Sequence, residues 1–166
     1  RTRDQVNTKR VQVVKYRGSG FGSNEYPFLI TPEGMFFDPI SDMDLTYDNS
    51  GRRISSGNST LDEILGGGYQ KGSCILISGD TGAGKTSIAA TFAAAACEKG
   101  EKVLYFTFEE SRNGLVSATR SAGIDLQPAL NKNLLSIVSS MPESMGIEEH
   151  LYSNTQTIEQ FRPDHI

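Results

Sequence analysis

The sequence has few of the residues that build cross-linked, metal-bound or membrane-embedded proteins. It contains only two cysteines, and Cys74 and Cys97 lie in apolar segments without metal-ligand spacing. This argues against a zinc site or a disulfide framework and favours a reducing compartment, so we expect a cytoplasmic protein. The longest apolar run, SIAATFAAAAC, is far shorter than the roughly 20 residues that span a bilayer, so we expect no association with a membrane.

The sequence also lacks a strong excess of one charge. Its formal net charge is -4 at pH 7, which favours neither a nucleic-acid-binding protein nor a disordered acidic tail. A local basic stretch from Arg1 to Arg17 is the exception. This stretch is not the basic n-region of a signal peptide with a cleavage site, so we expect no export. The chain closes where a new apolar segment begins, so we expect a part of a longer protein.

The first 50 residues alternate apolar and polar residues in the manner of strands. KRVQVVKYRG predicts a strand with Val11, Val13 and Tyr16 as candidates for its buried face. YPFLITPEGMFFDPI predicts two short strands joined by a turn at residues 31–34, and SDMDLTYDNSGRR predicts a linker. Without helices to cover a sheet, this segment is unlike a domain with a core of its own, so we interpret residues 1–50 as the β-rich tail of a preceding domain.

From residue 51 onward, predicted helices and strands alternate. Four helices are predicted. The first, STLDEIL, is capped by Ser59 or Thr60 and stopped by glycines, and the second, GKTSIAATFAAAACEKG, is closed by Gly100. The third, ESRNGLVSATRSAG, ends at Gly123, and the fourth is GIEEHLYSNTQTIEQF. The predicted buried strands are SCILISG, KVLYFTF and NLLSIVSS. This alternation is typical of an α/β fold with a parallel sheet and helices on both faces.

The segment SGDTGAGKTS has the residues of a phosphate-binding loop. It satisfies the pattern G-x-x-x-x-G-K-[ST] through Gly79, Asp80, Thr81, Gly82, Ala83, Gly84, Lys85 and Thr86, with Ser87 following. A predicted strand precedes it and a predicted helix follows it, as this chemistry requires. Backbone N–H groups would cradle the phosphates of ATP, Lys85 would reach the β- and γ-phosphates, and the Thr86 hydroxyl would ligate Mg²⁺. A glycine turn that only packs a helix on a sheet would not require the lysine and the hydroxyl.

Two adjacent carboxylates follow the next predicted strand, at the end of FTFEES. The carboxyl ends of strands in an open parallel sheet border the ligand crevice, so Glu109 and Glu110 are candidates for the phosphate side. Adjacent strand residues point to opposite faces, so one of the two would accept a proton from the attacking group or orient it. The alternative is that both acids only complement the dipole of the following helix.

Several segments resemble the RecA-superfamily ATPases, and among these the KaiC family. The resemblance is carried by STLDEILGGGYQKGSCILISGDTGAGKTSIAATF, FTFEESR and MPESMGIEEHL, and by KYRGSGFGSNEYPFLI before the linker. EESR, PES and EYPF are its most diagnostic pieces, because a generic phosphate-loop protein does not require them. The family carries two tandem copies of the domain. The resemblance therefore implies that residues 1–50 end the first copy and that residues 51–166 form the N-terminal part of the second.

The resemblance also implies an activity and an assembly. Members form two stacked six-membered rings with ATP between subunits, the first copy being a slow ATPase and the second phosphorylating its own Ser or Thr residues. Glu109 would be the base with Glu110 beside it, while Lys15 and Arg17 match residues that reach a neighbour's nucleotide. KaiB-like or KaiA-like clock proteins are implied partners. The Walker B acid and the phosphorylated residues would follow Ile166, so we expect no activity from this chain alone.

Two other functions stay open at the level of sequence. One is a RadA-like recombinase or DNA-dependent motor, against which the acidic balance and the lack of a basic, aromatic-interleaved surface argue. The other is a nucleotide-gated scaffold, in which ATP stabilises a ring by binding only its assembled state. Salt-dependent DNA affinity would indicate the first, and assembly with negligible turnover would indicate the second.

Overall fold

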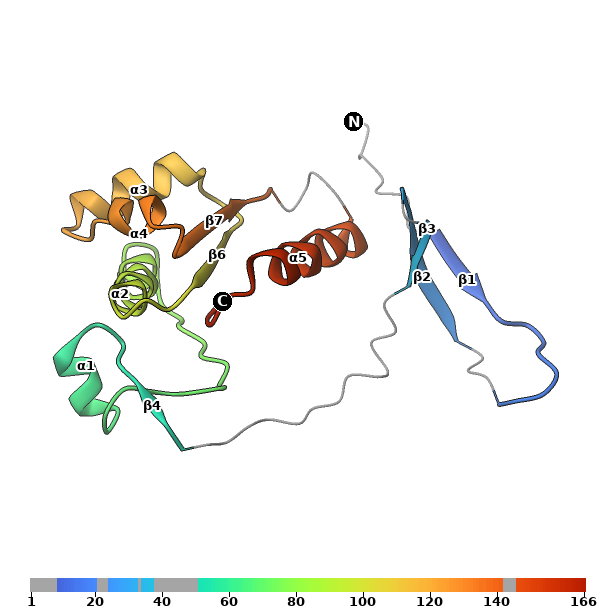
Figure 1. The fold of residues 1–166 in the computed structure, drawn as a ribbon, viewed down its shortest axis with the longest axis horizontal. Coiled ribbons are helices and arrows are strands. Elements are labelled where there is room, and N and C mark those ends of the chain that lie inside the picture. The colour runs from blue at the N-terminus through green and yellow to red at the C-terminus, as the bar shows by residue number, and fades with distance from the viewer. Residues whose placement is uncertain (1–8, 21–23, 33, 38–50, 142–145) are drawn as a thin grey trace. The chain divides into compact units, whose positions relative to one another are not determined.

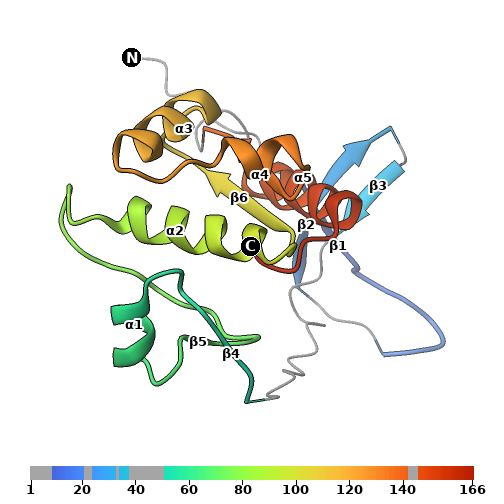
Figure 2. The ribbon, with the colours of Figure 1, turned by 60° about the vertical axis from the view of Figure 1, so that its left-hand side comes forward.

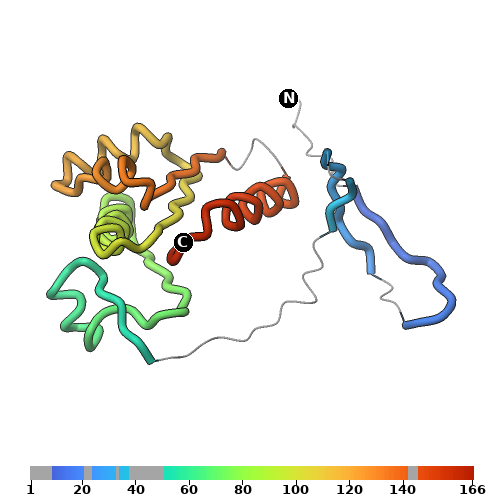
Figure 3. The backbone as a smooth tube through the Cα atoms, in the orientation of Figure 1, coloured from blue at the N-terminus to red at the C-terminus, as the bar shows by residue number. Residues whose placement is uncertain are grey.

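The computed structural model describes residues 9–20, 24–32, 34–37, 51–141 and 146–166 (Figure 1). The chain divides into two compact units, which are described separately. Unit 1 comprises Arg1–Leu45 and Met141–Gln160, and unit 2 comprises Thr46–Ser140 and Phe161–Ile166. Figure 3 traces the backbone through both. Most of the predicted linker, residues 41–53, lies outside the described residues, as do parts of the FGSNEYPF and MPES segments.

Unit 1 contains a three-stranded antiparallel sheet and most of one helix. Its strands are β1 (Lys9–Gln12), β2 (Glu25–Thr31) and β3 (Gly34–Phe37), in the order β1-β2-β3. The predicted turn between the second and third strands is confirmed, since Thr31 pairs with Gly34, whose φ of 125° suits glycine. The helix is α5 (Ile147–Phe161), and its Tyr152 ring packs edge-on against Phe36 of β3 at a centroid distance of 4.8 Å.

The predicted buried face of the first strand is wrong in two of its three residues. Val11 is half-buried, but Val13 is 41% exposed and Tyr16 is 61% exposed. The physical reason is the length of the pairing, because β1 ends at Gln12 where its register with β2 ends. Residues beyond that point have no sheet to bury them.

Unit 2 contains helices and strands in mixed order, as predicted, except that α4 follows α3 directly and one predicted strand is missing. Its elements are β4 (Arg53–Ile54), α1 (Ser59–Ile64), β5 (Tyr69–Gln70), α2 (Lys85–Glu98), β6 (Val103–Thr107), α3 (Arg112–Ser121), α4 (Gln127–Asn131) and β7 (Leu135–Ser139). Strands β6 and β7 pair in parallel, from Val103 opposite Leu135 to Thr107 opposite Ser139. Strands β4 and β5 form a short antiparallel pair. The mixed α/β class and the parallel pairing are therefore confirmed.

The core of unit 2 lies where α2, α3 and α4 meet one face of the β6–β7 pair. Helix α2 contributes its alanines and Cys97, and the other members come from the strands and from α3 and α4; they are Ala90, Ala93, Ala96, Cys97, Val103, Leu115, Leu126, Ala129, Leu130, Leu135 and Ile137. Small alanine side chains let α2 approach the sheet closely. Burial raises the pKa of the Cys97 thiol, which donates a 3.5 Å hydrogen bond to the Leu134 carbonyl. This cysteine is a packing residue.

The predicted buried strand at SCILISG does not form. Residues 73–79 are irregular and mostly exposed, with Leu76 89% exposed. A buried strand needs hydrogen-bond partners at its edges. Strand β7 lies along one edge of β6, and at the start of the other edge the Leu104 amide donates to the His165 carbonyl at 2.9 Å and the His165 amide donates to Lys102. Among the described residues, the strand partners of β6 are therefore β7 and His165, and none of them comes from residues 73–79.

The helix ends follow local chemistry. The predicted caps at Ser59 or Thr60 are wrong, because Asn58 caps α1 and its Oδ1 accepts a 3.0 Å hydrogen bond from the Leu61 amide. The glycine stops are confirmed, with φ of 85° at Gly100 and 84° at Gly123.

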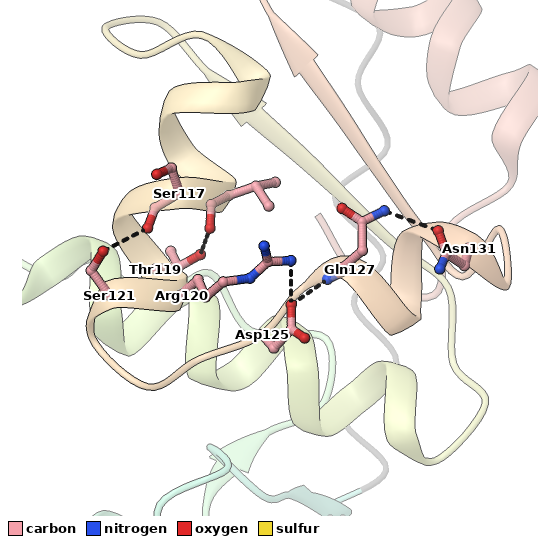
Figure 4. Close-up of polar contacts among 8 residues, drawn as sticks. Ser117, Thr119, Arg120, Ser121, Asp125, Gln127 and Asn131 are labelled. Atoms are coloured by element: carbon pink, nitrogen blue, oxygen red, sulfur yellow. Dashed lines mark hydrogen bonds and ion pairs between the residues drawn. The ribbon is translucent and has the colours of Figure 1, made fainter.

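Helix α4 was not predicted. Figure 4 shows the Asp125 carboxylate before it, which accepts hydrogen bonds from the Gln127 amide and the Arg120 guanidinium that lower its pKa.

Candidate functional site

The predicted phosphate loop forms a compact turn directly before α2. Gly82 and Gly84 have φ of 83° and 86°, which residues with a side chain rarely adopt. Gly84 is the N-cap of α2, and the Ala83 amide donates to the Asp80 carbonyl at 3.1 Å to close the turn. The glycine pattern therefore has a conformational cause at these two positions.

Gly79 lies close to Ala83 across the turn. A Cβ built on Gly79 would lie 3.2 Å from the Cβ of Ala83, so a side chain here would require Ala83 to move by a few tenths of an ångström. Glycine avoids this crowding, and a loop without side chains leaves its backbone N–H groups accessible to an anion.

Lys85 begins α2 and turns back across the loop. Its Nζ donates hydrogen bonds to the Gly79 carbonyl at 2.8 Å and to the Asp80 carbonyl at 2.9 Å. The ammonium group therefore lies against the backbone at the start of the loop. An ammonium has three donors, so it can keep loop contacts while it binds a phosphate oxygen.

The first turn of α2 supplies the remaining predicted ligands. Thr86 is exposed and Ser87 is half-buried. The Ile88 amide donates to the Gly84 carbonyl at 3.0 Å, so the amides before it in this turn have no helical acceptor four residues back. With the positive end of the helix dipole, they make this terminus suitable for an anion. Asp80 and Thr81 are exposed at the tip of the loop.

Glu109 and Glu110 lie in the turn between β6 and α3, and both are exposed. Helix α2 and strand β6 run in opposite directions, so the N-terminal end of α2 and the C-terminal end of β6 lie at the same end of unit 2 (Figure 2). Burial raises the pKa of Tyr105 in β6, and the Glu110 carboxylate raises it further. Of the two glutamates, Glu110 is thus the one whose negative charge raises the pKa of Tyr105.

Lys15 and Arg17 lie elsewhere. Both are exposed in the segment that follows β1 in unit 1, whereas the phosphate loop belongs to unit 2. The structure thus places them with the β-rich sheet, and their contact with a neighbouring subunit's nucleotide remains a prediction.

An apolar cavity of about 690 Å³ in unit 2 is separate from the phosphate loop. Its lining includes Ile75, Ile77, Phe92 and Tyr105, together with the His165 ring, whose Nε2 lies 2.9 Å from a carboxylate oxygen of Glu101. None of residues 79–86 lines it. The cavity therefore lies beside residues 73–79, the segment that was predicted to be a strand.

In the described parts of the chain, no helix is long and apolar enough to cross a bilayer. In the same ranges, no three His, Cys, Asp or Glu side chains are grouped so that they could hold a metal ion.

Comparison with known proteins supports the family resemblance. A family model described as "ATPase: KaiC" matches residues 54–163. The chain is 42% identical over 164 residues to "Circadian clock protein KaiC2" of Synechocystis sp., covering 98% of this chain and 29% of that protein. It is 41% identical over 158 residues to "Circadian clock oscillator protein KaiC" of Acaryochloris marina, covering 95% of this chain and 30% of that protein.

The protein of the same name from Synechococcus elongatus is 40% identical over 158 residues, with 95% of this chain and 30% of that protein covered. The chain thus spans about 30% of the length of these curated relatives. The matched ATPase model implies that this region binds a nucleotide, in agreement with the geometry of the phosphate loop. With a family model over residues 54–163 and these identities, the chain belongs to the KaiC family of ATPases.

Proposed function

We propose that this chain is the ATP-binding part of a KaiC-like protein whose intact form hydrolyses ATP and phosphorylates its own Ser or Thr residues. The observation that carries the proposal is the loop before α2, with two glycines at positive φ and the Lys85 ammonium over its backbone. Its position at the start of a helix gives an anion both N–H donors and a favourable dipole. Since the relatives are named as circadian clock proteins, we extend the proposal to a clock or related signalling role.

The residues of the loop would divide the work of binding ATP. The backbone of residues 79–87 would receive the phosphates, because its glycines leave the N–H groups accessible. Lys85 would exchange part of its bonding to the Gly79 and Asp80 carbonyls for oxygens of the β- and γ-phosphates.

Mg²⁺ fits the donors at this end of unit 2. Mg²⁺ binds through a few protein oxygens together with phosphate oxygens, and the Thr86 hydroxyl is exposed in the first turn of α2. Thr86 would hold the ion, which would neutralise charge on the phosphates when bound. Lys85 beside it would supply the second positive charge.

Glu109 would be the general base, with Glu110 beside it. The carboxylate would take the proton from an attacking water or Ser/Thr hydroxyl as its oxygen forms a bond to the γ-phosphorus. The bond between that phosphorus and the bridging oxygen breaks, and ADP leaves with the electron pair. Attack by water gives free phosphate, and attack by a hydroxyl gives phosphoserine or phosphothreonine.

The larger architecture belongs to the same proposal. We propose a RecA-like fold whose parallel sheet has helices on both faces, with residues 1–50 ending one repeat and residues 51–166 beginning the next. The intact protein would form a cytoplasmic hexameric ring in which Lys15 and Arg17 reach a neighbour's nucleotide. Support comes from the exposure of both cations and from the matched family model. Clock proteins of the KaiA or KaiB type would be its partners, and neither nucleic acid nor membrane would be.

The test is intact-mass spectrometry together with phosphate release on the full-length protein with Mg-ATP. The wild type should gain mass in phosphate increments, and Glu109→Gln should lose this gain. Glu98→Gln is the matched control, because Glu98 is also exposed in unit 2 but ends α2. Phosphate release without any mass gain would refute the autokinase and leave an ATPase or motor, and binding to single-stranded DNA would then be measured.

A further inference from the structure

Two hydroxyl groups hold the backbone of Glu110. Thr107 and Ser139 end β6 and β7 and lie opposite each other in the parallel register. The Thr107 Oγ1 donates to the Glu110 carbonyl at 3.2 Å and accepts from the Glu110 amide at 3.3 Å. The Ser139 Oγ donates to the same carbonyl at 2.8 Å. We define the Thr107 and Ser139 side chains as the hydroxyl clasp.

Backbone hydrogen bonding between the two strands continues past Thr107 and Ser139, which are the last residue pair of the sheet. Thr107 is only 8% exposed, and its carbonyl accepts a 3.0 Å hydrogen bond from the Ser140 amide. Its backbone thus remains tied to the neighbouring strand while its side chain holds the turn. The two donors on the Glu110 carbonyl come from different strands, so the turn cannot rotate without breaking contacts to both.

The other end of the turn is also held. Ser111 is the N-cap of α3, and its side chain accepts a 3.1 Å hydrogen bond from the Gly114 amide. Glu109 therefore lies between a buried strand end at Thr107 and an anchored residue at Glu110. Its backbone has few conformations available, whereas its exposed carboxylate remains accessible to a reactant.

We propose that Thr107 and Ser139 are positioning residues, which orient the Glu109–Glu110 turn for proton removal during phosphoryl transfer. The inference rests on the proposed function, because it concerns the turn that carries the proposed base. General-base catalysis depends on the placement of the base relative to the proton, and misplacement by about 1 Å can cost on the order of 100-fold in rate. Loss of the clasp would change this placement without removing a group that binds ATP.

The test compares Thr107→Val, Ser139→Ala and their combination with the wild type in the full-length protein. Valine keeps the shape of threonine and lacks its hydroxyl. We expect the double variant to lower kcat about tenfold, since the base is displaced and not removed, with the Kd for ATP within about twofold of the wild type. The single variant Thr107→Ser keeps the hydroxyl and should therefore retain most of the wild-type kcat. Amide hydrogen exchange across residues 108–111 should accelerate in the double variant, a readout independent of turnover.

Thr119→Val is the matched control. Thr119 is also buried, at 3% exposed, and its hydroxyl donates a 3.2 Å hydrogen bond to the Val116 carbonyl within α3 (Figure 4). Its loss should leave kcat and exchange at residues 108–111 unchanged. If the control lowers kcat as much as the clasp variants do, the effect is one of general stability and the inference is wrong.

Glu109→Gln and Glu110→Gln measured in parallel separate the inference from the proposed function. Loss of turnover in Glu109→Gln together with wild-type kcat in the clasp variants would overturn the inference alone. Full activity in both glutamine variants would overturn the proposed base and the inference together. A tenfold loss in the clasp variants, rescued by Thr107→Ser and accompanied by faster exchange, supports both.

Discussion

Removal of the Lys85 side chain is the most direct perturbation of the phosphate loop. In the structure its ammonium makes two hydrogen bonds to loop carbonyls, at 2.8 Å to Gly79 and at 2.9 Å to Asp80. Lys85→Ala removes these contacts and the positive charge that would meet the phosphates of ATP. The variant should therefore lose nucleotide affinity, because the loop amides alone must then compensate the polyanion.

The size of the effect follows from the exchange of contacts. Hydrogen bonds to charged groups contribute about 1.5 to 3 kcal/mol each, and neutral-acceptor bonds contribute less. Lys85 would gain bonds to two phosphate groups and give up part of its bonding to two carbonyls. The net loss on truncation is about 2 to 3 kcal/mol, which is roughly a 30- to 150-fold increase in Kd.

Isothermal titration calorimetry of the full-length protein with ATP measures this change. Lys99→Ala is the matched control, because Lys99 is the C-cap of the same helix and lies at its opposite end. Its Kd should remain within about twofold of the wild type, since the charge of an exposed residue is screened within a Debye length of about 10 Å. A Kd for Lys85→Ala within twofold of the wild type would refute the assignment of this loop to the phosphates.

Two further predictions concern the segment before the loop. Asn58→Ala should lower the free energy of unfolding by about 1 kcal/mol in a urea titration, because it removes the N-cap of α1, whereas Ser59→Ala should change it little; equal losses would contradict the cap assignment. Hydrogen bonds from Ser55 and Ser56 lower the pKa of Asp62 below its ordinary value of 3.8, so its contribution to stability is present above that value and is lost as the pH falls through the lower, folded-state pKa. Acid unfolding followed by circular dichroism should be less steep in Asp62→Asn in this range, and identical curves would refute the argument.

Local chemistry explains the predictions that succeeded. The turn before α2 was recognisable because Gly82 and Gly84 adopt the positive φ angles that their pattern predicts, whereas the ligand contacts of Lys85 and Thr86 remain predictions. The ends of α2 and α3 were recognisable because Gly100 and Gly123 adopt positive φ. Strands β6 and β7 were recognisable as continuous apolar runs, although periodicity alone did not say that they pair with each other.

One failed prediction concerned a local choice between neighbouring residues. Asn58 could have been preferred to Ser59 as the cap, since asparagine is among the best N-cap residues, but the choice depends on where the chain enters the helix. The hydroxyl clasp was hard to predict, because Thr107 and Ser139 are 32 residues apart in numbering and meet only through the β6–β7 register. The sequence indicated it only by placing a polar residue at the end of each apolar run.

The sequence by itself determined which residues are available for the proposed chemistry, namely a glycine loop with a lysine and a hydroxyl before a helix and two carboxylates after a strand, and it determined the family that the comparisons support. Only the tertiary structure decided which apolar segments become strands and how the carboxylate turn is held. The reason is that loop and cap geometry depends on neighbours along the chain, whereas a strand forms only where a partner strand lies beside it. In the described residues, β6 pairs with β7 and bridges to His165, and residues 73–79 pair with no strand.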